Sequence, residues 1–123
     1  MADSEDHQMN VLASHLAHTY IELARLCRLL PMPITLEEKV YNFTGSIPAV
    51  RRAAELALDE PMPEDMQANL FNACTFWLGG LDLFVLLANP EEFHTVRAHS
   101  AAGCLIQADI ALRDLGIALR NLS

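Results

Sequence analysis

The chain has 123 residues, enough for one hydrophobic core and typical of a single domain. Its 16 acidic and 8 basic residues give a formal net charge of −8 at pH 7, the wrong sign for direct binding to nucleic acid or to an anionic membrane surface. Its 3 cysteines contain no CxxC pair and indicate neither a disulfide framework nor a zinc site, so we expect a cytoplasmic protein with reduced thiols.

The first helix is predicted from about Ser4 to Leu30, and residues 1–6, which overlap its first turn, are expected to form a flexible acidic tail. Ser4 is a suitable N-cap, and Pro31 and Pro33 end the helix. Apolar residues recur at alternating steps of three and four, which predicts one buried seam. The seam consists of Met9, Leu12, Leu16, Thr19, Leu23, Leu26 and Leu30.

A capping box predicts the start of the second helix, because Thr35 can cap it and Glu38 can reach back to the Thr35 amide. The helix is then broken or kinked near Pro48, and the pattern does not decide between the two. Its second part, over about residues 47–59, is expected to turn four residues inward and to pair Arg51 weakly with Glu55. The four inward residues are Val50, Ala54, Ala57 and Leu58.

The third helix, over about residues 64–88, is apolar almost all round and should be central or interfacial. Gly79 and Gly80 in its middle either permit close helix contact or mark a bend. Asn89, followed by Pro90 and Glu92, predicts the start of a fourth helix that runs to about Leu122. The short connections favour an all-α fold, an up-and-down bundle of four main helices in a single domain over residues 1–123.

The fourth helix is apolar on two opposite sides. One seam consists of Ala101, Leu105, Ala108, Leu112, Leu115, Leu119 and Leu122. Ile106, Ile110 and Ile117 form a second row roughly 170° away, where a solvated face is expected. Arg113 and Arg120, together with Asp109, would frame this row as a polar rim. We interpret the row as an interface, either with a second copy or with another protein. The alternative is that the fold itself buries both sides.

A small apolar ligand pocket is the alternative function. Phe71, Trp77 and Phe84 supply aromatic surface around Gly79, and together they could line a cavity in the bundle. The more ordinary interpretation is that these aromatic residues fill the core.

No pattern of residues indicates an enzyme, a metal site or a cofactor. His18 and Glu22 are four residues apart beside His15, which gives two ligands on one helix and no complete site. Glu91 and His94 supply one Glu-x-x-His spacing, whereas a diiron bundle needs two. We therefore expect a non-enzymatic protein with no cofactor and no bound metal.

A short, acidic, all-helical chain with an apolar, charge-edged terminal helix resembles the LasR-specific quorum-sensing antiactivators of pseudomonads. The resemblance implies a homodimeric negative regulator of transcription. Such a protein would bind the ligand-binding domain of a LuxR-type transcription factor and block its dimerisation and DNA binding. The residues of this chain that would act are Ile106, Ile110, Arg113, Ile117 and Arg120.

Overall fold

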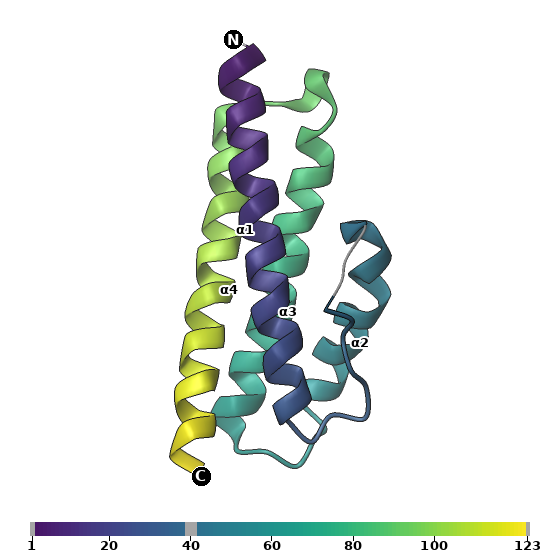
Figure 1. Ribbon diagram of the computed structural model, residues 1–123, viewed down its shortest axis with the longest axis vertical. Helices are drawn as coiled ribbons and strands as arrows, with labels where there is room; N and C mark the ends of the chain where they lie inside the picture. The colour runs from purple at the N-terminus through teal and green to yellow at the C-terminus, as the bar shows by residue number, and fades with distance from the viewer. Residues whose placement is uncertain (1, 39–41, 123) are drawn as a thin grey trace.

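The computed structural model describes residues 2–38 and 42–122, and this part of the chain forms an all-α bundle, as expected (Figure 1). The elements in chain order are α1 (Ala2–Leu29), the 3-10 turn η1 (Phe43–Ser46), α2 (Ile47–Ala57), α3 (Glu64–Leu87), the 3-10 turn η2 (Pro90–Glu92) and α4 (Thr95–Leu122).

Three long helices, α1, α3 and α4, lie side by side along the full length of the molecule. The shorter α2 packs against α3 on the side away from α4. Figure 1 shows that α3 runs opposite to both α2 and α4, as their short connections predict. One side of α4 therefore has no neighbouring helix.

Helix α1 begins at Ala2, so the expected acidic tail is instead part of the first helical turns, and Met1 lies outside the described residues. The predicted seam is buried at five of its seven residues, with Leu16, Thr19 and Leu23 fully buried, whereas Met9 and Leu26 are only partly buried. Thr19 is the exception in this seam because it carries a hydroxyl that must find a hydrogen-bond partner.

The predicted capping box at Thr35 is wrong. Residues 35–38 are not helical, and residues 39–41 lie outside the described part of the chain. The Glu38 carboxylate, expected to cap the helix, instead lies 3.2 Å from the Arg28 guanidinium of α1. The Glu38 carboxylate, which the capping box required, is therefore in contact with α1 and not with the Thr35 amide.

Pro48 neither kinks nor ends a helix, because it lies in the first turn of one. A 3-10 turn over Phe43–Ser46 precedes α2, and Pro48 occupies the first turn, where its missing N–H costs no hydrogen bond. Val50, Ala54 and Ala57 are buried as expected, but Leu58 is exposed because α2 ends before it.

The expected pairing of Arg51 with Glu55 is also wrong. Arg52 lies 3.2 Å from the Glu55 carboxylate instead, one helical turn away on the same exposed face.

Helix α3 is central, with Met66, Leu70, Cys74, Trp77 and Leu81 buried. Among the described helices, it is the one that is long and apolar enough to cross a membrane, even with Asp82 in its sequence. The core helix of a bundle meets the same criterion of length and composition, and α3 contacts α1, α2 and α4.

Close helix contact explains Gly80 but not Gly79. The helix is continuous through both of them. A Cβ built on Gly80 would lie 3.0 Å from a methyl carbon of Leu105, whereas one on Gly79 would meet the Cys104 sulfur at 3.6 Å. Gly80 therefore allows α4 to approach α3 with the Leu105 side of α4 facing inward.

The predicted start of the fourth helix is displaced by several residues. Asn89 does act as a cap, because its side-chain oxygen accepts a hydrogen bond from the Glu91 amide at 3.2 Å. The element that it caps is the short 3-10 turn Pro90–Glu92, and α4 begins only at Thr95.

We predict opposite effects of substitution at the two glycines. Gly80→Val should lower the free energy of unfolding by about 1–3 kcal/mol, because the added atoms overlap Leu105. Gly79→Ala should be neutral or raise it by up to about 1 kcal/mol, since its Cβ has ordinary contact distance and alanine favours helix. Urea unfolding followed by circular dichroism measures both. Equal effects at the two positions would contradict the packing described.

Candidate functional site

The inner side of α4 forms part of the core. Ala101, Leu105, Ala108 and Leu115 are each fully buried, and Leu112 is nearly so. Leu122, assigned to the same seam, is exposed at the end of the helix. The side of α4 that faces α3 and α1 is therefore the one that the longer seam predicts.

The outer side of α4 carries the predicted isoleucine row, and the fold leaves it accessible. Ile106 is 50 % exposed, Ile110 38 % and Ile117 42 %. All three point away from the buried seam, and the bundle covers each of them only in part. The possibility that the bundle itself buries both sides of this helix is excluded for these residues.

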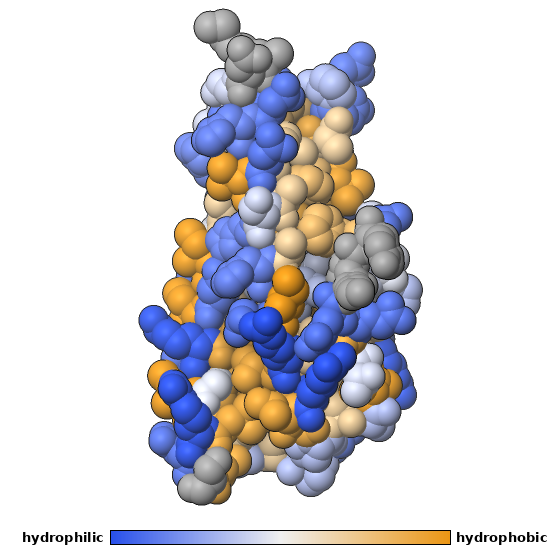
Figure 2. Space-filling view, in the orientation of Figure 1, coloured by the Kyte–Doolittle hydropathy of each residue, from blue (hydrophilic) through white to orange (hydrophobic). Residues whose placement is uncertain are grey.

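The arginines lie between this row and α1. Arg113 and Arg120 are exposed and line a groove of about 470 Å³ between α1 and α4, opposite Glu22 and Leu26. Arg113 makes only a loose contact of 3.7 Å with Asp114. Figure 2 shows apolar surface exposed on this face over the lower parts of α1 and α4, bordered by hydrophilic groups.

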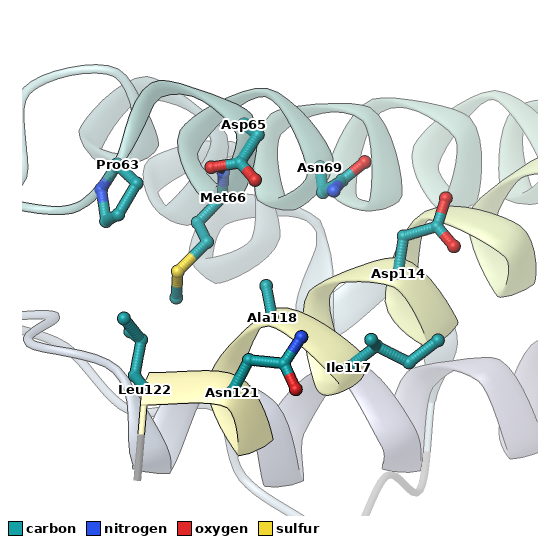
Figure 3. A pocket seen from close by; sticks show the side chains of 9 residues that line it. All are labelled: Pro63, Asp65, Met66, Asn69, Asp114, Ile117, Ala118, Asn121 and Leu122. Atoms are coloured by element: carbon teal, nitrogen blue, oxygen red, sulfur yellow. Dashed lines mark hydrogen bonds between the residues drawn. The ribbon is translucent and has the colours of Figure 1, made fainter.

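The opposite flank of the row is acidic and amide-rich. Ile117 lies at the edge of a groove of about 430 Å³ between α3 and α4 (Figure 3). Asp65 and Asn69 approach it from α3, and Asp114 and Asn121 from α4. The outer face of α4 is thus an apolar row with Arg113 and Arg120 beside Glu22 on the flank toward α1, and with Asp65 and Asp114 on the flank toward α3.

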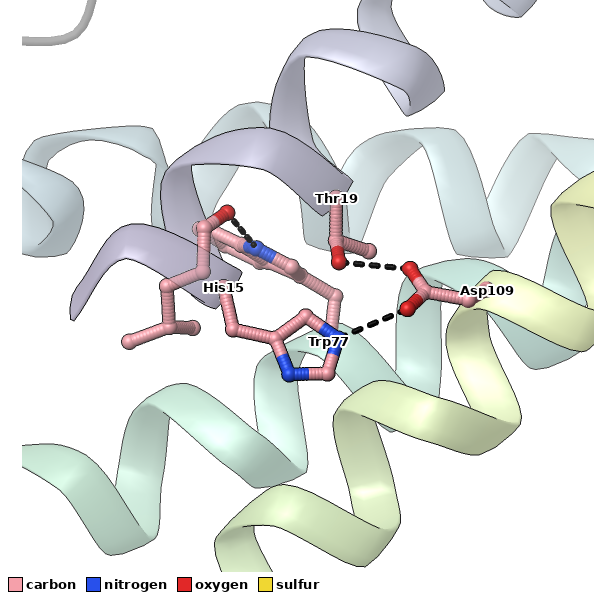
Figure 4. A network of polar contacts seen from close by, with 5 residues as sticks. His15, Thr19, Trp77 and Asp109 are labelled. Atoms are coloured by element: carbon pink, nitrogen blue, oxygen red, sulfur yellow. Dashed lines mark hydrogen bonds and ion pairs between the residues drawn. The ribbon is translucent and has the colours of Figure 1, made fainter. Parts of the chain in front are cut away.

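Asp109, expected in the polar rim, is turned toward α1 instead. Its carboxylate accepts a hydrogen bond from the Thr19 hydroxyl at 2.6 Å, and its other oxygen lies 2.6 Å from His15 Nε2 (Figure 4). This contact gives the buried Thr19 its partner and fixes α4 against α1. We call the three residues the Asp109 clamp.

The Asp109 clamp has the wrong order of groups for nucleophilic catalysis. The Thr19 hydroxyl donates to the carboxylate and not to the imidazole, so the histidine is not placed to activate it. Its geometry supports a structural role.

The four residues of the predicted ligand pocket do not surround one cavity. Trp77 is fully buried, donates a hydrogen bond from Nε1 to the Leu16 carbonyl at 3.0 Å, and packs 5.3 Å from the ring of Tyr20. Gly79 instead faces α4. Phe84 packs edge-on against Phe43.

Phe71 is only partly buried at the edge of the core. The structure thus gives each of the four residues a separate packing role.

The other candidate side chains are also accounted for. Glu22 pairs with Arg25 at 3.1 Å, and Glu91 and His94 lie exposed before α4 begins. Within residues 2–38 and 42–122, no group of three or more His, Cys, Asp or Glu side chains is placed to hold a metal ion.

Burial also governs the chemistry of two of the thiols. Burial raises the pKa of the Cys27 thiol to about 11 and that of Cys74 further, so both stay protonated at neutral pH. A protonated thiol is a poor nucleophile, so neither residue is suited to covalent chemistry at that pH.

Comparison with models of protein families, with curated proteins and with solved structures finds no match. The site must therefore be interpreted from its own geometry.

We predict that Asp109→Ala lowers the free energy of unfolding by about 1–3 kcal/mol, because it leaves the buried Thr19 hydroxyl without an acceptor. Asp114→Ala is the matched control on the same helix, and its exposed carboxylate, 3.7 Å from Arg113, should contribute little. Urea unfolding compares the two. A loss for Asp109→Ala no larger than for the control would refute the anchoring role of the Asp109 clamp.

Proposed function

We propose that this protein is a non-enzymatic interaction module that binds another protein through the outer face of α4. The observation that carries this proposal is the accessible row Ile106, Ile110 and Ile117, which lies opposite the buried seam of the same helix. Single exposed apolar residues are common on proteins, but a row of β-branched residues edged by charges is typical of interfaces.

Burial of this row supplies only part of the free energy that specific binding requires. Full burial of an isoleucine contributes about 1.5–3 kcal/mol, and each of the three is already half-buried or more in the bundle, so covering the remainder gives about 1 kcal/mol each. Contacts of the flanking arginines, whose aliphatic stems can cover apolar surface, would add to this. Charge at the edges then selects the partner.

The resemblance to the quorum-sensing antiactivators gives the proposal a specific form. In this form the partner is the ligand-binding domain of a LuxR-type transcription factor, and the protein is a negative regulator in the cytoplasm. An apolar helix that replaces one used by the factor for its own pairing would hold the factor as an inactive complex. Ile106, Ile110 and Ile117 would be buried, with Arg113 and Arg120 at the edge.

We predict that Ile117→Asp abolishes retention of the partner while helicity and melting temperature stay near wild type. Val85→Asp is the matched control, since Val85 on α3 is 46 % exposed against 42 % for Ile117. Tagged wild-type and variant chains are compared in pull-downs from the native cytoplasm, with circular dichroism of each.

The supporting outcome is a protein retained by the wild type and by Val85→Asp but lost with Ile117→Asp. Unfolding of Ile117→Asp, or an identical set of proteins retained by all three chains, would contradict the assigned surface.

The regulatory form has its own test. With a purified LuxR-type factor, excess of this protein should convert the factor dimer into a heteromeric complex and remove its binding to DNA. Size-exclusion chromatography with mass determination, and a gel-shift assay, measure the two effects. Undiminished DNA binding across a panel of such factors would refute the antiactivator role and leave the interaction surface to be tested by the pull-down.

A further inference from the structure

The groove between α1 and α4 continues toward the carboxyl end of α4. A neighbouring cavity of about 470 Å³ shares three lining residues with it, namely Leu26, Gly116 and Arg120. We call the two cavities together the α1–α4 groove, and Figure 2 shows apolar surface on this face over the lower parts of both helices. The apolar residues that line it are Leu26, Leu29, Leu112, Gly116 and Leu119.

The dimensions of the α1–α4 groove suit a short helix. It extends from Asp109 to Arg120 along α4, which is about 16 Å of helix axis and matches about three turns of a second helix. Near its middle, a Cβ built on Gly116 would meet nothing within 4 Å, so there is room for a bulky side chain of an occupant. An amphipathic helix that lays its apolar side into a groove is a common mode of peptide recognition.

The carboxylates of the α1–α4 groove already have partners. Both oxygens of Asp109 are engaged in the Asp109 clamp. The Glu22 carboxylate lies 3.1 Å from the Arg25 guanidinium on the same helix. Neither carboxylate therefore requires a cation from an occupant of the groove.

The two arginines of the α1–α4 groove have no close carboxylate. Arg113 has only its contact of 3.7 Å with Asp114, and Arg120 forms no ion pair with the described residues. The two lie seven residues apart, so they project from the same side of α4 about 10 Å apart along its axis. In a chain with 16 acidic and 8 basic residues, two such arginines beside an apolar floor are complementary to an occupant that is apolar and anionic.

We propose that the α1–α4 groove binds an acidic amphipathic helix of the partner protein. Apolar side chains of this helix lie over Leu26, Leu112 and Gly116, and carboxylates two turns apart on its flank meet Arg113 and Arg120. The proposal rests on the proposed function, because it names the chemistry of the segment that the partner presents beside the isoleucine row.

The groove and the isoleucine row form one continuous surface. Arg113 and Arg120 lie between them on α4, so a single partner can cover both. Burial of the row supplies only part of the free energy of binding, and burial of the groove floor together with two charge-assisted contacts adds to it.

Binding of labelled synthetic peptides to the full chain tests the chemistry of the occupant. The first peptide has about 14 alanine-rich residues, with leucines at alternating steps of three and four and glutamates beside them. A second peptide carries lysine in place of glutamate, and a third carries serine in place of leucine. Fluorescence anisotropy should show that the first binds at least about tenfold more tightly than the other two, and that salt weakens its binding.

A pair of glycine substitutions on α4 tests the location. Gly116→Leu fills the α1–α4 groove from its open side and should weaken binding of the glutamate peptide by more than about tenfold. Gly103→Leu is the matched control, because a Cβ there also meets nothing within 4 Å but lies outside the groove. Its affinity should equal that of the wild type, and circular dichroism verifies that both variants fold.

Charge reversal tests the arginines without adding bulk. Arg120→Glu should weaken binding of the glutamate peptide about tenfold, and a further Arg113→Glu should make the lysine peptide the tighter binder. Arg51→Glu is the matched control, since Arg51 on α2 also forms no ion pair with the described residues and lies outside the groove. It changes the net charge equally and should alter affinity less than about twofold.

Three outcomes would overturn the proposal. They are equal affinity of the wild type for the three peptides, unchanged affinity of the folded Gly116→Leu variant, and an equal effect of Arg120→Glu and Arg51→Glu. Dimerisation of the purified chain that Gly116→Leu abolishes would assign the groove to a second copy and would also overturn it.

The pull-down distinguishes these failures from failure of the proposed function. A cellular partner lost with Ile117→Asp but retained by Gly116→Leu would leave the proposed function intact and remove the groove from it. Retention of that partner by Ile117→Asp would instead remove the proposed function.

Discussion

The close approach of α3 and α4 at Gly80 is the tightest packing constraint found among the glycines of the described helices. Because Gly80 has no side chain, Leu105 lies where a Cβ would crowd it, and α4 is rotated so that its leucine and alanine seam faces inward. The isoleucine row lies opposite the buried seam of α4. When the seam faces the core, the row therefore faces outward. The buried seam of α4 and its accessible outer face are thus two sides of the same helix orientation.

The Asp109 clamp supplies the second constraint on α4. It joins α1 to α4 across 90 and 94 residues of sequence, through the two oxygens of one carboxylate. Apolar packing is tolerant of small rotations, whereas two hydrogen bonds to one group are directional. We infer that the clamp keeps the outer face in a fixed orientation, which suits a surface that must match a partner.

The periodicity of apolar residues correctly predicted which side of each single helix is buried. The seam through Leu16 and Leu23, the central position of α3 and the two sides of α4 all follow from apolar spacing within single helices. The capping box at Thr35 was wrong, because residues 35–38 form no helix and Glu38 contacts Arg28 of α1 instead, and local spacing contains no information about a contact with another element. The predicted burial of Leu58 was also wrong. Leu58 lies just beyond the end of α2, and spacing does not give the exact end of a helix.

The candidate site was predicted only in part, because spacing within one helix does not show which side chains meet between helices. The isoleucines were found from their spacing within one helix, and all three are exposed as that spacing predicts. The turn of Asp109 toward α1 depends on the rotation of two helices, which spacing does not give. The buried hydroxyl of Thr19 in an otherwise apolar seam was the available signal, because such a group requires a partner.

The outer face of α4 can bind only one protein at a time, so its availability depends on how much of the protein the cell contains. If self-pairing and capture of a regulator both use this face, each excludes the other. Once most chains are paired, the amount of unpaired chain rises only with about the square root of total abundance, by mass action. The cell would then be buffered against overproduction of the protein, with the strongest response per molecule at low expression.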